Sequence, residues 1–281
     1  MIHNGYSRQK ASSFILLFLI ICNILVNGQD SLRHKVYTVN PYIDIPITTV
    51  GAATAIWGLN TVNRKPALDS LTIIHLDAND INRFDRSATR QDAEFASRAR
   101  TLSDYGMVVS FSLPFLLMID KKIRADWAPL LLLYLESQAI NGNLYSWGAA
   151  FNVDRIRPLV YNSEVPWNER TGKRIQNSFY SGHTSSSATA SFFMAKVYCD
   201  YHPELGNNKY FIYSLALIPP VYTGIFRYVG MKHFPTDVLT GLTIGAATGI
   251  LIPFLHKRTP SGLTVIPFAG EVKGLALSYN F

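Results

Sequence analysis

Three short clusters in this 281-residue chain carry the side chains best suited to chemistry. They are Asp154-Arg-Ile-Arg-Pro158, Ser178-Phe-Tyr-Ser-Gly-His-Thr-Ser185 and Arg227-Tyr-Val-Gly-Met-Lys-His-Phe-Pro-Thr-Asp237. An arginine guanidinium stays charged at any working pH and makes planar, bidentate hydrogen bonds to phosphate oxygens. The second cluster leads into a helix-compatible stretch, where free backbone N–H groups and the helix dipole favour an anion. Together these residue types predict a site for a phosphoryl group.

The spacing inside the second and third clusters adds to this prediction. Gly182 lets the backbone approach an anion closely, because it has no Cβ. Asp237, four residues after His233, can reach one imidazole nitrogen and hold the other as an unprotonated nucleophile, as in hydrolytic triads. Each cluster alone is typical of a loop, a helix end or a structural His–Asp pair. Their occurrence in order, each at the edge of an apolar stretch, favours one shared site.

The three clusters resemble the motifs of the type 2 phosphatidic acid phosphatase (PAP2) superfamily, also called the acid phosphatase/vanadium haloperoxidase superfamily. The family pattern is Lys, six residues, Arg-Pro; then Pro-Ser-Gly-His; then Ser-Arg, five residues, His, three residues, Asp. The resemblance covers about residues 100–255. The matching residues are Arg157-Pro158, Ser181-Gly182-His183, Arg227, His233 and Asp237. The departures are Ala150 in place of the Lys, Tyr180 in place of the Pro and Phe226 in place of the Ser.

This resemblance implies an all-α helical bundle whose motifs converge at one end, and hydrolysis of a phosphomonoester or pyrophosphate. It implies that His233 is a nucleophile forming a phosphohistidine, that His183 is the general acid, and that Asp237 orients the His233 imidazole. The implied phosphate-binding residues are Arg157, Arg227, Ser181 and Gly182. It implies no metal and no other cofactor, because cationic side chains take that role. The seven histidines also form no His-Glu-x-x-His zinc motif.

Ala150 removes one cation from the phosphate pocket that the family pattern implies. A charge-assisted hydrogen bond is worth about 1.5–3 kcal/mol, which corresponds to about one or two decades in rate or affinity. Arg155 is the expected partial replacement, because it lies two residues before Arg157. A catalytically impaired envelope protein or a non-enzymatic transporter therefore stays open as an alternative.

Composition narrows the class of protein. Hydrophobic residues make up 48% and charged residues 16% of the chain, below the roughly 25% charged residues of soluble proteins. This excludes intrinsic disorder, and the two cysteines, Cys22 and Cys199, exclude a disulfide scaffold. The net charge of +7 favours phosphate-bearing partners. We expect a phosphorylated lipid or a small phosphoester as the partner, and no nucleic acid.

Four regions are expected along the chain. Residues 1–29 form a positive segment and a short apolar run typical of a signal peptide or an uncleaved signal anchor. Residues 30–104 are predicted to form an N-terminal helical and polar region, and residues 105–258 the catalytic helical domain. Residues 259–281 alternate in the manner of a β-hairpin and are predicted to form a β-rich tail.

The apolar runs predict a membrane protein. The expected spans are 14–28, 106–119, 125–147, 184–199, 210–228 and 235–254, with 46–61 not crossing. Placing the cationic residues after two of the runs in the cytoplasm puts 148–183 and 227–234 on the outer face. This predicts a bacterial-type inner-membrane enzyme with its active site facing the periplasm.

The substrate depends on that placement. In a bilayer, a lipid phosphate of the phosphatidate, phosphatidylglycerol phosphate, lipid A or undecaprenyl pyrophosphate type can reach the pocket laterally. A soluble periplasmic acid phosphatase acting on small phosphoesters is the alternative, and the β-rich tail favours it. A vanadium haloperoxidase, which binds vanadate in the same pocket, is a further alternative.

Overall fold

A computed structural model describes residues 35–258, 263–269 and 273–279. The expected signal segment, residues 1–29, lies outside the described residues. The helices are α2 (Pro41–Val62), α3 (Ser70–Ile74), α4 (Ala93–Ser112), α5 (Lys121–Arg124), α6 (Trp127–Asn143), α7 (Trp167–Arg170), α8 (Gly182–Tyr201), α9 (Lys209–Leu215), α10 (Ile218–Val229) and α11 (Pro235–His256). The strands β1 (Leu263–Ala269) and β2 (Lys273–Tyr279) pair as an antiparallel hairpin, as the alternation predicts.

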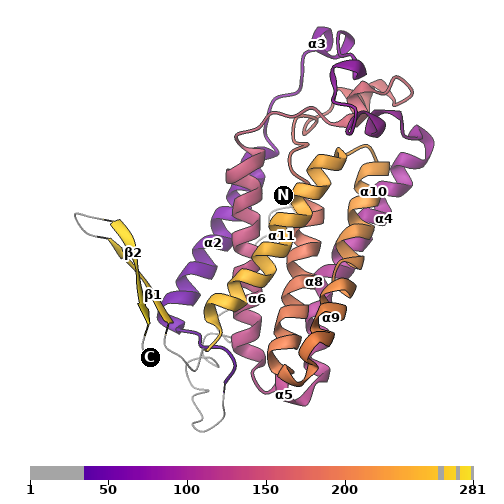
Figure 1. Ribbon diagram of the computed structural model, residues 1–281. Coiled ribbons are helices and arrows are strands. Elements are labelled where there is room, and N and C mark those ends of the chain that lie inside the picture. Colours follow the sequence, from indigo (N-terminus) through magenta and orange to yellow (C-terminus); the bar gives the residue numbers. More distant parts are fainter. Residues whose placement is uncertain (1–34, 259–262, 270–272, 280–281) are drawn as a thin grey trace, which may run out of the picture.

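The long helices form an antiparallel bundle (Figure 1). In chain order, α2, α4, α6, α8, the consecutive pair α9 and α10, and α11 run alternately along its axis. As a result, the loops 63–92, 151–181 and 230–234 all lie at one end, the upper end in Figure 1. The all-α bundle expected from the motifs is therefore confirmed, and the three motifs meet at its loop end.

Helices α8 and α11 make the closest packing in the bundle, through a row of glycines. Gly241, Gly245 and Gly249 recur every fourth residue and therefore lie on one face of α11. A Cβ atom on Gly245 would lie 2.1 Å from the Ser185 carbonyl oxygen of α8. Only glycine permits this separation, because small residues let two helix backbones approach each other.

The core of the bundle lies between α6 and α8. Its largest cluster joins buried apolar side chains of these helices, including Leu130, Leu133, Tyr134, Phe193 and Val197. Tyr134 packs on Phe193 with ring centroids 5.2 Å apart, and its hydroxyl donates to the Phe111 carbonyl oxygen at 2.7 Å. This core fixes the helices that lead to the loop end.

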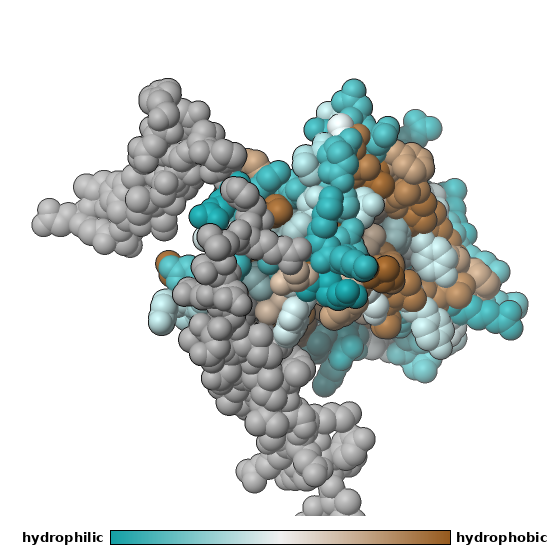
Figure 2. All heavy atoms as spheres, turned by 90° about the horizontal axis from the view of Figure 1, so that it is seen from below, coloured by the Kyte–Doolittle hydropathy of each residue, from teal (hydrophilic) through white to brown (hydrophobic). Residues whose placement is uncertain are grey.

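Large apolar side chains are also exposed on the outside of the bundle, and Figure 2, which views the molecule from below, shows hydrophobic residues gathered along one side. Exposed large hydrophobic side chains include Ile47, Val50 and Trp57 of α2, Val108, Val109 and Phe115 of α4 and its extension, Ile218, Val221 and Ile225 of α10, and Leu251, Phe254 and Leu255 of α11. Within the described residues, two helical segments are long and apolar enough to cross a bilayer, Ala93–Ile119 and Pro235–His256. Such continuous exposed apolar surface marks a face that contacts something other than water.

One feature departs from the expected organisation. Helix α4 runs across the boundary expected between residues 104 and 105. The run 46–61, expected not to cross a bilayer, lies inside α2, which is not one of the two described helical segments that are long and apolar enough to span one. Because α2 packs along α6, it belongs to the bundle that frames the loop end.

Candidate active site

A cavity of about 690 Å³ lies at the loop end of the bundle. Its wall includes the predicted residues Arg157, Gly182, His183, Arg227 and His233. The other two predicted residues, Ser181 and Asp237, are fully buried next to this wall. Three stretches that are distant in sequence thus come together, and a cavity of this size is in the range that holds small-molecule ligands.

His233 lies in the short loop between α10 and α11 with only 2% of its surface exposed. Its Nδ1–H donates to the Ser178 carbonyl oxygen at 2.6 Å. Because a carbonyl only accepts, the neutral imidazole keeps its lone pair on Nε2. Burial and the positive charges of Arg227 and Arg157 hold the pKa of His233 well below its usual range. The ring is therefore unprotonated at neutral pH, and the lone pair on Nε2 is available to react.

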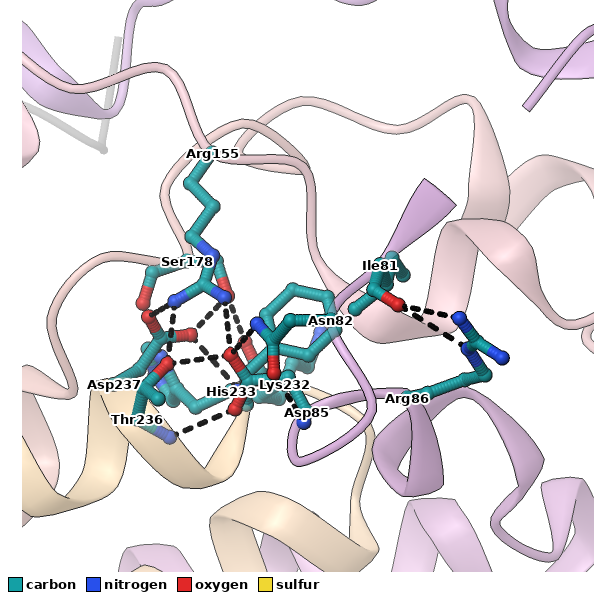
Figure 3. A network of polar contacts seen from close by, with 11 residues as sticks. Ile81, Asn82, Asp85, Arg86, Arg155, Ser178, Lys232, His233, Thr236 and Asp237 are labelled. Carbon is teal, nitrogen blue, oxygen red and sulfur yellow. Dashed lines mark hydrogen bonds and ion pairs between the residues drawn. The ribbon is translucent and has the colours of Figure 1, made fainter. Parts of the chain in front are cut away.

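Asp237 supports His233 indirectly, which differs from the direct contact expected from the sequence (Figure 3). Its carboxylate accepts from the Ser178 hydroxyl at 2.6 Å and from the Phe234 backbone N–H at 2.8 Å. Ser178 in turn binds the imidazole through its carbonyl oxygen. Asp237 therefore fixes both the residue that orients His233 and the residue that follows it.

Arg155 is not the replacement cation that its position suggested. Its guanidinium pairs with Asp237 and, at 2.7 Å, with Asp85 (Figure 3). Asp85 is fully buried and also accepts from the Thr236 backbone N–H at 3.0 Å and the Thr236 hydroxyl at 2.7 Å. This network ties the loop before α4 to the start of α11 and uses the charge of Arg155.

Lys232 is one of three further cations on the cavity wall, with Lys173 and Arg174. It precedes His233, and within the described part of the chain its ammonium group has no hydrogen-bond or ion-pair partner. Burial, together with the guanidinium of Arg157, lowers the pKa of Lys232 to about 7. Motif comparison missed this residue, because the position before the histidine is not part of the pattern. The sequence signal that could have indicated it is a lysine directly before His233 in a chain whose first motif has Ala150 in place of the family lysine.

His183 stands in the first turn of α8 and contacts Asp104 of α4. Its Nε2–H donates to an Asp104 carboxylate oxygen at 3.0 Å. Arg227 donates to the same oxygen and to the Ser103 hydroxyl, both at 3.3 Å. Asp104 thus holds a histidine and an arginine of two different motifs. It lies 79 residues before His183, and no local spacing in the sequence indicates it.

Ser181 and Gly182 have different roles at the start of α8. The Ser181 backbone N–H donates to the Asp237 carbonyl oxygen at 3.0 Å, and its hydroxyl bonds to that of Thr184 at 2.8 Å. Ser181 therefore caps the helix and does not face the cavity. Gly182 lines the cavity, and a Cβ atom there would lie 3.2 Å from the Tyr145 ring. The helix N-terminus beside it favours an anion.

The two motif arginines are buried with hydrogen-bonding capacity to spare. Arg157 donates to the Asn177 carbonyl oxygen at 3.3 Å, and Arg227 is held by α4 as described above. The Nε atoms of both are buried and have no partner among the described residues. Buried donors are normally satisfied, so the two guanidiniums are placed to bind an anion in the cavity.

A helical bundle that presents two histidines and several cations in one cavity defines a phosphoryl-transfer site. The PAP2 superfamily model matches residues 126–260. Phosphatidylglycerophosphatase B of Bacillus subtilis is 31% identical over 158 residues, which cover 53% of this chain and 67% of that relative. The chain therefore belongs to the PAP2 superfamily and is a PAP2-type phosphatase.

One solved structure is also similar. It is the crystal structure of the first transmembrane PAP2 type phosphatidylglycerolphosphate phosphatase, from Bacillus subtilis. The similarity covers 75% of this chain and 94% of that chain, with 20% sequence identity and a TM-score of 0.40.

Proposed function

We propose that this phosphatase removes the terminal phosphate of a membrane lipid, with a phosphoglycerol lipid of the phosphatidylglycerol phosphate type as its substrate. The observation that carries the proposal is the cationic cavity with the free Nε2 of His233, at one end of a bundle with apolar outer faces. The name of the Bacillus subtilis relative supports the choice of lipid.

In the proposed mechanism, His233 Nε2 attacks the phosphorus and the P–O bond to the lipid breaks. The leaving oxygen takes a proton from His183, which Asp104 orients, and the lipid alcohol departs. A water molecule then attacks the phosphorus of the phosphohistidine and gives a proton to His183. The P–N bond breaks, and inorganic phosphate leaves.

Arg157, Arg227 and Lys232 stabilise the charge on the phosphoryl oxygens in this mechanism. Ala150 is fully buried and, as an alanine, carries no charge, and Arg155 is engaged by two carboxylates. Lys232 therefore supplies the cation that the family lysine would provide. The negative charge of the bound phosphate favours the charged form of Lys232 and the protonated form of His183. Substrate binding therefore prepares both groups for their roles.

The apolar outer faces support placing the bundle in a bilayer. Leu59 of α2 and Met107 of α4 lie on the cavity wall beside the polar groups. They suit the boundary between a phosphate headgroup and its lipid chains, and a lipid would reach the cavity between these helices. The cationic turn of α5, Lys121–Arg124, lies at the far end of the bundle. It favours an orientation with the cavity on the periplasmic side of the inner membrane.

Phosphate release in detergent micelles tests the substrate. We expect the wild type to hydrolyse phosphatidylglycerol phosphate with a higher kcat/KM than para-nitrophenyl phosphate. His233→Ala should reduce release to background, whereas His75→Ala, at an exposed histidine outside the cavity, should keep the wild-type rate. Equal kcat/KM for the two substrates would contradict the lipid assignment, and near-normal turnover by His233→Ala would contradict the site.

Trapping the covalent intermediate tests the mechanism separately. Acid-unstable, base-stable radioactive label should appear on the wild type after brief mixing with substrate labelled in its terminal phosphate. The label should be absent from His233→Ala. Label on His233→Ala at the wild-type level would rule out this nucleophile.

A further inference from the structure

A second cluster of charged groups lies toward the end of the bundle opposite the cavity. It joins Asp44 near the start of α2, Glu136 of α6 and His256 at the end of α11. One ligand atom from each of the three side chains lies within 4.8 Å of the others. Both carboxylates are 5% exposed. Buried ionised groups of this kind require a compensating charge.

The orientation of His256 shows that its Nε2 atom faces the two carboxylates as a bare lone pair. Its Nδ1–H donates to the Ile252 carbonyl oxygen at 2.9 Å, so the neutral ring has no proton on Nε2. This atom lies 3.5 Å from Asp44 Oδ1 and 3.9 Å from Glu136 Oε2. These separations exceed a hydrogen bond but match two ligands of one metal ion, about 3–4 Å apart for bonds of about 2.0–2.2 Å.

Glu136 provides a second, independent observation. Its Oε2 atom is buried and has no hydrogen-bond partner among the described residues, and it points toward His256. A buried carboxylate oxygen without a donor is rare in proteins. The second oxygen of Asp44 is already satisfied, because it accepts from the Asn40 backbone N–H at 2.6 Å. That bond leaves Asp44 Oδ1 free for a ligand.

As long as both acids are ionised, the charges of the cluster do not cancel on their own. Two carboxylates and a neutral imidazole carry −2, and an imidazolium would still leave −1. Lys257 follows His256 in sequence, yet it pairs with Asp200, as does Lys196. In the part of the chain that the structure describes, His256 is the one ion-pair partner of both Asp44 and Glu136. A divalent cation would neutralise the cluster completely.

We propose that Asp44, Glu136 and His256 form a structural site for a divalent metal ion, with zinc as the best match. Zinc binds histidine nitrogen and carboxylate oxygen, and a zinc site with three protein ligands completes its tetrahedral coordination with a water molecule. The Nδ1–H bond to the Ile252 carbonyl is the contact that orients a ligating histidine. The ion would join α2, α6 and α11, so its binding free energy contributes to folding. This site is separate from the proposed phosphatase chemistry.

Metal analysis of the purified full chain tests the site. Protein dialysed against a chelator is incubated with Zn²⁺, passed through a desalting column and measured for bound zinc and for Tm. We expect one zinc per chain and a Tm raised by several degrees in the wild type. Both effects should be lost in Glu136→Gln and His256→Ala. The matched control is His202→Ala, a histidine that also has two acidic partners, Asp120 and Glu204, and it should bind zinc like the wild type.

Two results would overturn the proposal. One is zinc content and Tm that do not differ between the wild type and Glu136→Gln. The other, which needs no variant, is a Co²⁺-loaded wild type without the visible absorption bands of a protein-bound ion, or with bands that Zn²⁺ does not remove. Phosphatase turnover at the opposite end of the molecule serves as the check that each variant is folded.

Discussion

At the scale of single residues, the central feature is the adjacency of Lys232 and His233. One side chain carries positive charge into the cavity and the next carries the free Nε2 lone pair. Both sit in the loop that Asp237 holds through the Phe234 backbone N–H and Ser178. A small change in this loop would therefore move a cation and a nucleophile together.

Removing the charge of Lys232 is the most direct test of its role. Lys232→Met keeps the length and apolar stem of the side chain but loses one charge-assisted hydrogen bond, worth about 1.5–3 kcal/mol. We expect kcat/KM to fall about 10- to 100-fold, measured by phosphate release. Lys65→Met, at a lysine paired with Asp154 and not on the cavity wall, should leave kcat/KM unchanged. Wild-type kinetics in Lys232→Met would show that the family lysine has no replacement here.

The pH dependence of kcat/KM follows from the same two residues. His233 has a pKa well below its usual range, so it stays unprotonated at neutral pH and the acid limb should lie below about pH 6.5. Lys232 has a pKa of about 7; it is charged below that pH and loses its charge as the pH rises. We therefore expect kcat/KM to decline above about pH 7. The alkaline limb has a second component, because burial and the charge of Arg227 hold the pKa of the proposed general acid, His183, below its usual value. In Lys232→Met only the part of the decline near pH 7 should therefore disappear, and an identical alkaline limb in both proteins would contradict the assignment.

Sequence motifs identified the residues that contact the cavity most directly. Arg157, His183, Arg227 and His233 all line it, because the chemistry of a phosphoryl group restricts both their types and their spacing. The motifs did not identify Asp104 or Asp85, which act through contacts with residues far along the chain. Such partners are defined by the packing of helices, and no local pattern encodes that packing.

At the scale of elements, the glycine row of α11 sets how closely α8 and α11 approach. Gly245→Ala would place a methyl group 2.1 Å from the Ser185 carbonyl oxygen, so the helices must separate. We expect destabilisation of about 1–3 kcal/mol and a Tm lower by about 2–10 °C, measured by thermal unfolding in detergent. Gly148→Ala, where a Cβ atom meets nothing within 4 Å, is the control. An unchanged Tm in Gly245→Ala would mean that the helices tolerate a wider spacing.

The elements themselves were predictable to different degrees. The apolar run of α11 and the alternation of the β1–β2 hairpin are strong local signals, and both elements form. The first turns of α4 carry charged residues, so the apolar run begins well after the helix does. The boundary expected at residue 104 therefore falls inside that helix. The place of helix α2 in the bundle could not be predicted locally, because it depends on packing against α6.

At the scale of the whole molecule, the apolar outer faces govern where the protein resides. Side chains such as Val109 and Phe211 are 60% and 65% exposed, and surface of this kind is stable against lipid chains. We expect the full chain to stay in the pellet when membranes are washed with alkaline carbonate, as judged by immunoblotting. Release into the supernatant, or extraction by osmotic shock alone, would favour the soluble alternative.

The buried ion pairs of Arg155 with Asp85 and Asp237 affect how strongly the cavity attracts a phosphate. Asp85 and Asp237, which hold the loop before α11 in place, share Arg155 as their counter-ion, and Arg155 does not line the cavity. The cations that face the phosphate are thus not consumed by neutralising the scaffold, apart from the single contact of Arg227 with Asp104. The attraction of the cavity for a terminal phosphate is consequently reduced by internal pairing mainly at Arg227, and the departing lipid, which has lost that phosphate, is attracted less.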